Sequence, residues 1–257
     1  MLVNGELRYN GGVPSFPANE IMNLPQLSRY LHLPEEQVRK LVDRGSIPSR
    51  RVNGNYLFSK DEVHRWLEAR IGVSDDKELY RIEQTLDATV PAGEIEQPVW
   101  ISSLIPSGAI AVPLQSRTKD SVIRSMVQLA ENTGLLWDSA EMTEAVKQRE
   151  ELHTTALDNG VALLHSRRPL PGILGDTFIT MGIVPSGLHF GGGFDSMTDV
   201  FFLICSLDDR VHLRILTRLS RILTVPNFLD TLRTLGNESE IRHWILRTES
   251  DLVKDEQ

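Results

Sequence analysis

The chain has 257 residues, 40% of them hydrophobic, and a formal net charge of −8, which is ordinary for a globular protein of one large or two modest domains. No apolar run reaches the length of a membrane span, and the first residues lack the basic and apolar segments of a signal peptide. Cys205 is the only cysteine, which excludes an intrachain disulfide and a cysteine-based zinc site. We therefore expect a cytoplasmic protein with no membrane insertion.

Charge is distributed unevenly along the chain. Residues 21–72 carry nine Lys and Arg against six Asp and Glu, or +3, whereas residues 73–257 carry 17 against 27, or −10. This asymmetry predicts two modules that have different partners. The expected organisation is a flexible tail at 1–20, a first module at 21–72, an acidic linker at 73–100, a second module at 101–248 and a C-terminal tail at 249–257.

The first module has the pattern of two short helices followed by a hairpin. Asn23 is a suitable N-cap for a helix over residues 24–31. Residues 34–42 predict a second helix, because acids come early and bases late, as the helix dipole favours. Asn53 and Gly54 stand between two short strand-like segments, which indicates a β-hairpin turn. A closing helix is expected to follow.

Together these features resemble the winged helix-turn-helix of the excisionase and MerR-type DNA-binding families, over about residues 24–71. The resemblance implies that the second helix enters the major groove of double-stranded DNA and that the hairpin forms a wing. Cations suit phosphates, and forked or amide side chains suit base edges. The residues that would contact DNA are Gln37, Arg39, Lys40, Arg50, Arg51 and Asn55.

Two further expectations concern this module. Because a charge of +3 is modest, docking of another protein is the alternative to DNA binding. A reader of a single half-site usually gains affinity by dimerising, so we expect a homodimer.

From residue 100 onward, strand and helix patterns alternate as in an α/β domain. The segment at 200–207 is almost wholly apolar, which is typical of a strand at the centre of a sheet. The expected elements are strands at 109–114, 160–164 and 200–207, a turn between 185 and 188, and helices that begin after 116–120 and at 138–149, 211–223, 227–235 and 239–246.

Two histidines and an arginine occupy the ends of elements in this second module. Arg149 lies near the end of a helix, His165 ends an apolar strand, and His212 opens a helix after another apolar strand. A neutral imidazole is suited to carry a phosphoryl group on nitrogen, and the arginine fork matches phosphate oxygens. The three residues therefore indicate phosphoryl transfer, for which no metal or other cofactor is expected.

The second module resembles the enzyme IIA domain of the fructose/mannitol class in the bacterial phosphotransferase system, to which the nitrogen-regulatory IIA proteins also belong. The resemblance covers about residues 101–248 and rests on the run from Arg149-Glu150 to His165, the apolar strand at 201–205, and Val211-His212-Leu213. It implies an α/β (α+β) fold with a mixed sheet flanked by helices. It also assigns roles: His165 as the phosphorylated residue, His212 as the second active-site histidine, and Arg149 as a phosphate ligand. We expect Thr154 and Ser166 to be further phosphate contacts.

The expected function is that His165 accepts a phosphoryl group from an HPr-like phosphocarrier protein, in a regulator that couples this event to DNA binding. The absence of a IIB or membrane IIC segment beside a DNA-binding pattern favours regulation. One alternative is a sugar-transport component that passes the phosphoryl group to a IIB protein. The other is a IIA-like binding module without catalysis, which Leu164 and Ser166 favour because the family usually has Pro and Gly at these positions.

Overall fold

The computed structural model describes residues 21–31, 34–60, 99–191 and 196–254, together with short pieces at 2–3, 6–7, 62–63, 66 and 79–80. The chain divides into two compact units, residues 1–96 and residues 97–257. Each unit has buried apolar side chains of its own. None of the helices in the described part of the chain is long and apolar enough to cross a membrane.

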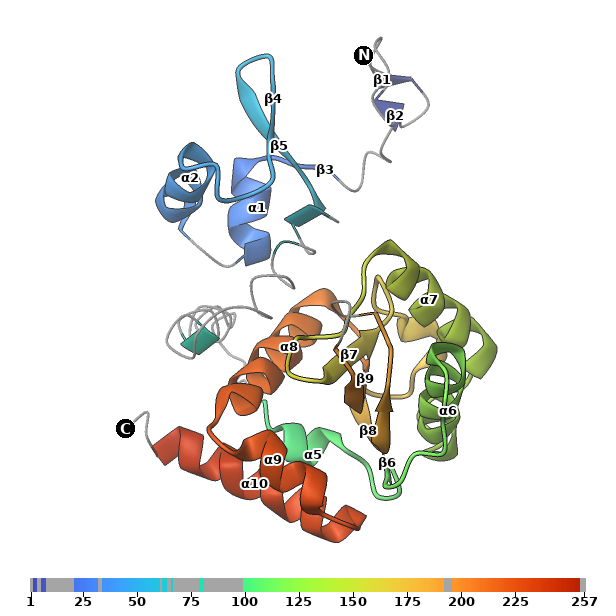
Figure 1. Cartoon of the computed structure of the whole chain (residues 1–257). Helices are drawn as coiled ribbons and strands as arrows, with labels where there is room; N and C mark the ends of the chain where they lie inside the picture. The colour runs from blue at the N-terminus through green and yellow to red at the C-terminus, as the bar shows by residue number, and fades with distance from the viewer. Residues whose placement is uncertain are drawn as a thin grey trace. The chain divides into compact units, whose positions relative to one another are not determined.

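The described part of the N-terminal unit contains a short two-stranded pair, a helix pair and a three-stranded antiparallel sheet (Figure 1). The three-stranded sheet has the strand order β3-β5-β4, in which β4 and β5 form the hairpin. The elements are β1 (Leu2–Val3), β2 (Glu6–Leu7), β3 (Ile21–Met22), α1 (Leu24–Leu31), α2 (Glu35–Asp43), β4 (Arg50–Val52) and β5 (Asn55–Ser59).

Local side-chain chemistry explains these boundaries. The Asn23 side chain accepts a hydrogen bond from the Gln26 backbone N–H at 2.9 Å, and the Gln26 side chain accepts one from the Asn23 N–H at 2.8 Å, so the start of α1 is capped in both directions. Asn53 and Gly54 both have positive φ, 48° and 82°, as the turn of a two-residue hairpin requires. The predicted helix pair and hairpin are confirmed. The expected tail, linker and closing helix lie largely outside the described residues.

The C-terminal unit is a four-stranded mixed sheet between two layers of helices (Figure 1). Strands β7 and β9 are parallel, β9 and β8 are antiparallel, and β8 and β6 are parallel. The elements are α5 (Ile101–Leu104), β6 (Ile110–Ala111), α6 (Lys119–Asn132), α7 (Ser139–Leu152), β7 (Val161–His165), a 3₁₀ turn (Pro171–Ile173), β8 (Phe178–Leu188), β9 (Thr198–Cys205), α8 (Asp209–Thr224), α9 (Phe228–Thr234) and α10 (Glu238–Lys254).

The two faces of this sheet pack against different helices. Helices α6 and α7 cover one face, whereas α5 and α8 lie against the other (Figure 1). Alternate residues of a strand point to opposite faces. Ala162 and Leu164 of β7 belong to the core cluster under α6 and α7, so His165 points to the face that α8 covers. The predicted mixed sheet flanked by helices is confirmed, with β9 in its interior.

Three expectations about the edges of the elements are wrong. Strand β8 continues through Pro185 to Leu188, because a register irregularity after Ile183 accommodates the proline without a turn. Helix α10 does not end at 246 but runs to Lys254, because Glu249 is buried and hydrogen-bonded to α5; residues 249–254 are thus helical rather than a tail. The strand expected at 109–114 contains only the two residues of β6.

Candidate phosphoryl-acceptor site

The predicted residues meet where the parallel strands β7 and β9 end. His165, the last residue of β7, pairs with Ile204 of β9. Strand β9 then leads through Ser206 into α8, whose N-cap Asp208 accepts a hydrogen bond from the Val211 backbone N–H. In sheets of this kind, sites commonly form at the carboxyl ends of parallel strands, because the connections that follow them converge there.

The two ring nitrogens of His165 have different partners. Nδ1 lies 2.7 Å from the backbone carbonyl of Leu163, and since a carbonyl can only accept, Nδ1 carries the proton. Nε2 is consequently the nitrogen with the lone pair, and it accepts a hydrogen bond from Nε of Arg149 at 3.1 Å. The His165 side chain is buried, with 2% of its surface exposed. The geometry thus presents Nε2 as the nucleophilic atom.

Arg149 is held by both ends of its guanidinium group. While Nε donates to His165, Nη1 donates to the backbone carbonyl of His153 at 2.8 Å. Arg149 lies in the last turn of α7, where the partial negative charge of the helix end favours a cation. Its guanidinium therefore stands next to Nε2 of His165 in a fixed orientation.

His212 completes the group from a different part of the chain. Its ring centroid lies 4.9 Å from that of His165, and the two rings are inclined by 56°. Nδ1 of His212 lies 3.2 Å from Oγ of Ser206, and the His212 side chain is buried. The first turn of α8 carries His212, so the positive end of that helix dipole is close by. The structure brings together the three residues that the sequence selected.

The two additional phosphate contacts expected from the sequence have other partners here. Oγ1 of Thr154 accepts a hydrogen bond from the Ala156 backbone N–H at 3.2 Å. The Ser166 hydroxyl donates to the backbone carbonyl of Arg168. Both hydroxyl groups therefore stabilise local turns, and a phosphate contact by either remains a prediction.

Sequence reasoning missed two polar residues beside the site. Ser206 contacts His212, and the buried Glu150 binds the loop between α7 and β7. The only sequence signal was that Glu150 directly follows Arg149, which does not reveal where its side chain points. Within the described residues, no group of three His, Cys, Asp or Glu side chains is arranged to hold a metal ion.

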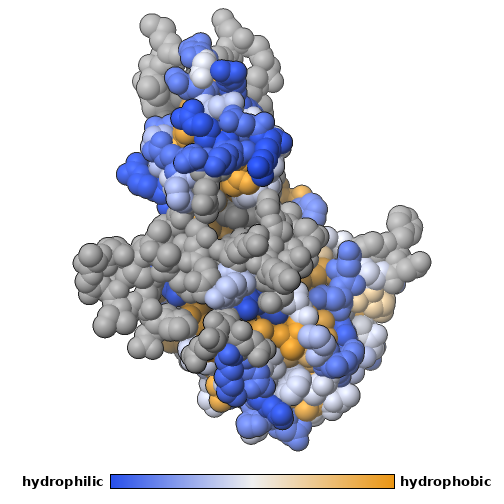
Figure 2. Space-filling model, turned by 90° about the vertical axis from the view of Figure 1, so that its left-hand side faces the viewer, coloured by the Kyte–Doolittle hydropathy of each residue, from blue (hydrophilic) through white to orange (hydrophobic). Residues whose placement is uncertain are grey.

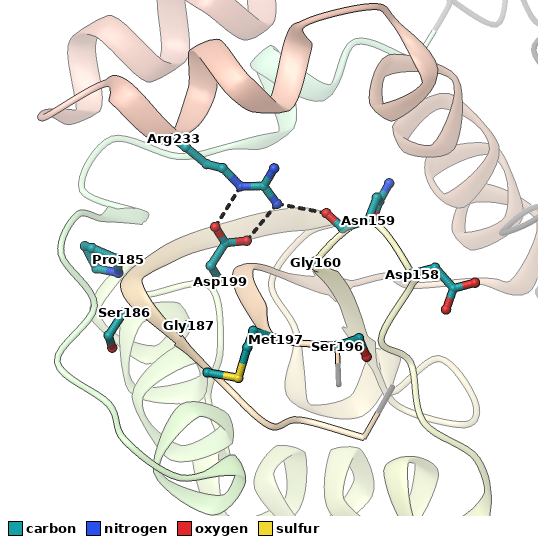
Figure 3. Close-up of a pocket in the computed structure, with 10 residues that line it drawn as sticks. All are labelled: Asp158, Asn159, Gly160, Pro185, Ser186, Gly187, Ser196, Met197, Asp199 and Arg233. Atoms are coloured by element: carbon teal, nitrogen blue, oxygen red, sulfur yellow. Dashed lines mark hydrogen bonds and ion pairs between the residues drawn. The ribbon is translucent and has the colours of Figure 1, made fainter. Parts of the chain in front are cut away.

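A separate pocket of about 350 Å³ lies at the amino ends of the same strands (Figure 3). Asp199 accepts two hydrogen bonds from Arg233, at 2.7 and 2.9 Å, and Arg233 also donates to the Asn159 backbone carbonyl at 2.8 Å. Gly160 lines this pocket and precedes His165 by five strand residues, or about 16 Å. The pocket is therefore distinct from the histidine site.

Two of the three residues of α2 that were selected for DNA binding are exposed. Arg39 and Lys40 both face solvent, and Lys40 forms an ion pair with Glu36 at 2.9 Å. An exposed pair of this kind contributes little stability, so it leaves the charge available for another anion. The side chain of Gln37 lies outside the described residues.

The wing residues are also on the surface. Arg50 forms a salt bridge with Glu62 at 3.0 Å, and the Arg51 guanidinium lies 5.6 Å from the ring centroid of Tyr56. Asn55, the first residue of β5, is exposed. Figure 2 shows that the coloured surface of this unit is largely hydrophilic on the face in view. A role of these residues in DNA binding remains a prediction.

Comparison with known proteins agrees with this architecture. Residues 103–248 match the family model "Phosphoenolpyruvate-dependent sugar phosphotransferase system, EIIA 2", and residues 21–71 match a helix-turn-helix domain model. The chain is 25% identical over 162 residues to the fructose-specific EIIABC component of the phosphotransferase system of Bacillus subtilis, covering 59% of this chain but only 22% of that protein.

Two solved structures are also similar to this chain. The nitrogen regulatory protein IIA-Ntr of Neisseria meningitidis has a TM-score of 0.51 and 19% identity, and the match covers 57% of this chain and 99% of that one. The mannitol IIA of Escherichia coli has a TM-score of 0.49 and 20% identity, with 55% and 98% covered. The chain belongs to the EIIA 2 family of the phosphoenolpyruvate-dependent sugar phosphotransferase system, and carries its IIA domain behind an N-terminal helix-turn-helix domain.

Proposed function

We propose that Nε2 of His165 accepts a phosphoryl group from an HPr-like phosphocarrier protein. The observation that carries this proposal is the arrangement of Arg149 and Leu163 around the ring, which leaves the proton on Nδ1 and puts a guanidinium beside Nε2. Imidazole is a suitable acceptor because its phosphoramidate is labile enough to pass the group onward. The EIIA 2 family match supports the same chemistry.

The transfer balances without a cofactor. As the phosphorus–nitrogen bond on the carrier breaks, its electron pair returns to the carrier nitrogen, and the lone pair of His165 Nε2 forms a new phosphorus–nitrogen bond. The Nδ1 proton stays on Nδ1 and remains donated to the Leu163 carbonyl. Arg149 gives up its hydrogen bond to Nε2 and directs the same N–H to the oxygens of the phosphoryl group. The N-terminus of α8, which carries His212, adds positive potential beside the transferring group. Positioning and electrostatics then supply most of the catalysis.

The helix-turn-helix domain gives the transfer a regulatory purpose in this proposal. The domain binds double-stranded DNA through the exposed cations of α2 and the wing, and a homodimer reads two half-sites. Phosphorylation of His165 adds about two negative charges, which changes how the IIA domain interacts with a partner or with the DNA-binding domain. The operator affinity then depends on the flux through the phosphotransferase system.

The test is phosphorylation of the full chain by purified enzyme I, HPr and phosphoenolpyruvate, read by intact mass. Wild type gains one phosphate, and His165→Ala gains none. His153→Ala is a matched control that keeps the phosphate, because the His153 side chain is exposed and only its backbone carbonyl, which the substitution preserves, contacts Arg149. A wild-type chain that stays unmodified contradicts the proposal and leaves a IIA-like binding module as the function.

A second candidate function is sugar transport, in which His165 passes the phosphoryl group to a IIB protein. The EIIABC relative in Bacillus subtilis favours it, since its name joins a IIA part to B and C parts. The two functions separate in one experiment with phosphorylated protein. Rapid phosphoryl transfer to an added IIB domain, with DNA binding absent, supports transport; DNA binding that changes with phosphorylation supports regulation.

A further inference from the structure

We infer that Glu150 is a positioning residue for His165, acting through the loop that joins α7 to β7. This inference rests on the proposed phosphoryl-acceptor function. The Glu150 side chain is 1% exposed and accepts hydrogen bonds from three groups. These are the Thr155 backbone N–H at 3.0 Å, the Thr155 hydroxyl at 2.6 Å, and Nζ of Lys119 at 3.1 Å. A buried carboxylate with three donors holds the loop firmly, because each charge-assisted bond is stronger than a neutral one.

The loop passes this constraint to the histidine through the backbone. The carbonyl of Thr155 accepts a hydrogen bond from the Leu163 N–H at 3.2 Å, and the Leu163 carbonyl is the group that holds Nδ1 of His165 at 2.7 Å. Thr155 is thus the link between the Glu150 carboxylate and the strand that sets the tautomer of His165. In addition, Glu150 directly follows Arg149 on α7, so the same helical turn positions the guanidinium.

The contact with Lys119 extends this arrangement to α6. Lys119 is the first residue of α6, where the positive end of the helix dipole disfavours a cation. Its Nζ is nevertheless held between the Glu150 carboxylate, at 3.1 Å, and the ring of Phe190, whose centroid is 5.0 Å away. Pairing with Glu150 and the aromatic face offsets the unfavourable helix position. The Glu150 carboxylate on α7 therefore joins α6 to the loop that leads into β7.

The test compares Glu150→Gln with Glu151→Gln in the full chain. Glu151 is the neighbouring, exposed carboxylate of the same helix and serves as the matched control. For the phosphoryl transfer from HPr, Glu150→Gln lowers the rate at saturating carrier about tenfold, because a small displacement of the nucleophile is costly, while the half-saturating carrier concentration stays unchanged. Glu151→Gln transfers at the wild-type rate. When wild type accepts phosphate, equal rates for the two variants would overturn the inference.

A second readout does not depend on phosphorylation. The ¹⁵N signals of the His165 imidazole report the proton on Nδ1 in wild type, and Glu150→Gln converts this pattern to a mixture of tautomers. Their assignment comes from the signals that His165→Ala lacks. If wild type accepts no phosphate but its tautomer changes in Glu150→Gln, the proposed function fails while the positioning role stands. A tautomer pattern that Glu150→Gln leaves unchanged overturns the positioning role.

Thr155 offers a milder variant in case Glu150→Gln does not fold. Thr155→Val removes the hydroxyl that donates to Glu150 and preserves the shape of the side chain. Thr155→Ser, by contrast, keeps the hydroxyl. We expect Thr155→Val to show the slower transfer and the mixed tautomers, and Thr155→Ser to recover both. Thr155→Val that matches wild type in both measurements would also contradict the inference.

Discussion

Arg149 donates its Nε–H to Nε2 of His165 across 3.1 Å, so the proposed phosphate ligand is hydrogen-bonded to the proposed acceptor atom. Both side chains are buried, and the guanidinium is anchored a second time on the His153 carbonyl. An arginine that already touches the nucleophile needs only a small displacement to contact the oxygens of an incoming phosphoryl group. The unphosphorylated site is thus preorganised for the transferred group.

Replacing this arginine tests the preorganisation. Arg149→Lys keeps the charge but loses the planar fork, so we expect the rate of phosphoryl transfer to fall about 100-fold, as when one stabilising donor is removed from an active site. Rapid-quench measurement of a single turnover gives this rate. The control is Arg124→Lys, an exposed arginine on α6 that we expect to have no effect. A twofold change or less in Arg149→Lys would exclude a bidentate role.

Salt dependence tests the proposed DNA interface on α2. Arg39→Ala and Lys40→Ala each remove one phosphate contact, so each variant lowers the slope of log affinity against log salt by about one. Fluorescence anisotropy with a random-sequence duplex at several salt concentrations measures that slope. Arg29→Ala, an exposed arginine in the last turn of α1, is the control. The interface lies elsewhere if all three variants keep the wild-type slope.

We expect the loss of the Glu249 side chain on α10 to lower the stability of the C-terminal unit. Its buried carboxylate accepts hydrogen bonds from the Ile101 and Ser102 backbone N–H groups, at 2.5 and 2.9 Å, and so caps the start of α5. Glu249→Ala leaves these buried N–H groups without that acceptor, which lowers the free energy of unfolding by about 1–3 kcal/mol. Urea unfolding measures the loss. Glu240→Ala, which removes an exposed carboxylate from the same helix, provides a comparison.

The same residue predicts a pH dependence. Burial raises the pKa of Glu249 above 4.5, and the hydrogen bonds from Ser102 and Ile101 and the charge of Arg218 oppose this shift only in part. The unfolded chain therefore releases the proton first, so the free energy of unfolding falls as pH rises from about 4.5 through the folded pKa. Glu249→Gln lacks this decline, and the difference between the two unfolding curves against pH isolates it. Parallel curves would contradict the raised pKa.

We expect backbone strain when Gly160, at the opposite end of β7 from His165, is replaced by another residue. The φ of Gly160 is +84°, and a Cβ there would lie 2.7 Å from Nη2 of Arg233 and 3.1 Å from Oδ1 of Asp199. We expect Gly160→Ala to lower the free energy of unfolding by about 1–2 kcal/mol from the left-handed backbone alone. Gly236→Ala is the control, because nothing lies within 4 Å of its added Cβ. Thermal unfolding of both variants gives the comparison.

Much of the fold could be predicted because its signals are local. Asp138 and Asp208 begin α7 and α8 as N-caps, and each accepts a hydrogen bond from the backbone three residues later. The almost wholly apolar run at 200–207 indicated an interior strand, and β9 has that position. Arg149, His165 and His212 were selected because each lies at the end of such an element, which places them at one edge of the sheet.

The rest depended on contacts that no local pattern records. Pro185 indicated a turn, yet a strand next to β9 can continue past a proline when the register shifts. The buried Glu249 extends α10 through its hydrogen bonds with Ile101 and Ser102. These partners are nearly 150 residues away in the sequence, so no local pattern predicts the extension. Glu150 is similar: its bonds to Thr155 and Lys119 follow from the path of a loop, which the sequence did not specify.

The contact between Arg149 and His165 has a consequence for chemical labelling. Reagents that acylate imidazole react with the nitrogen that has the lone pair. On His165 this atom is Nε2, which is buried and hydrogen-bonded to a guanidinium group. His153 and His189 are exposed and should react first. The rate at which His165 is acylated therefore measures how often Arg149 moves aside, and a phosphocarrier that opens the site on docking would reveal itself by accelerating that one modification.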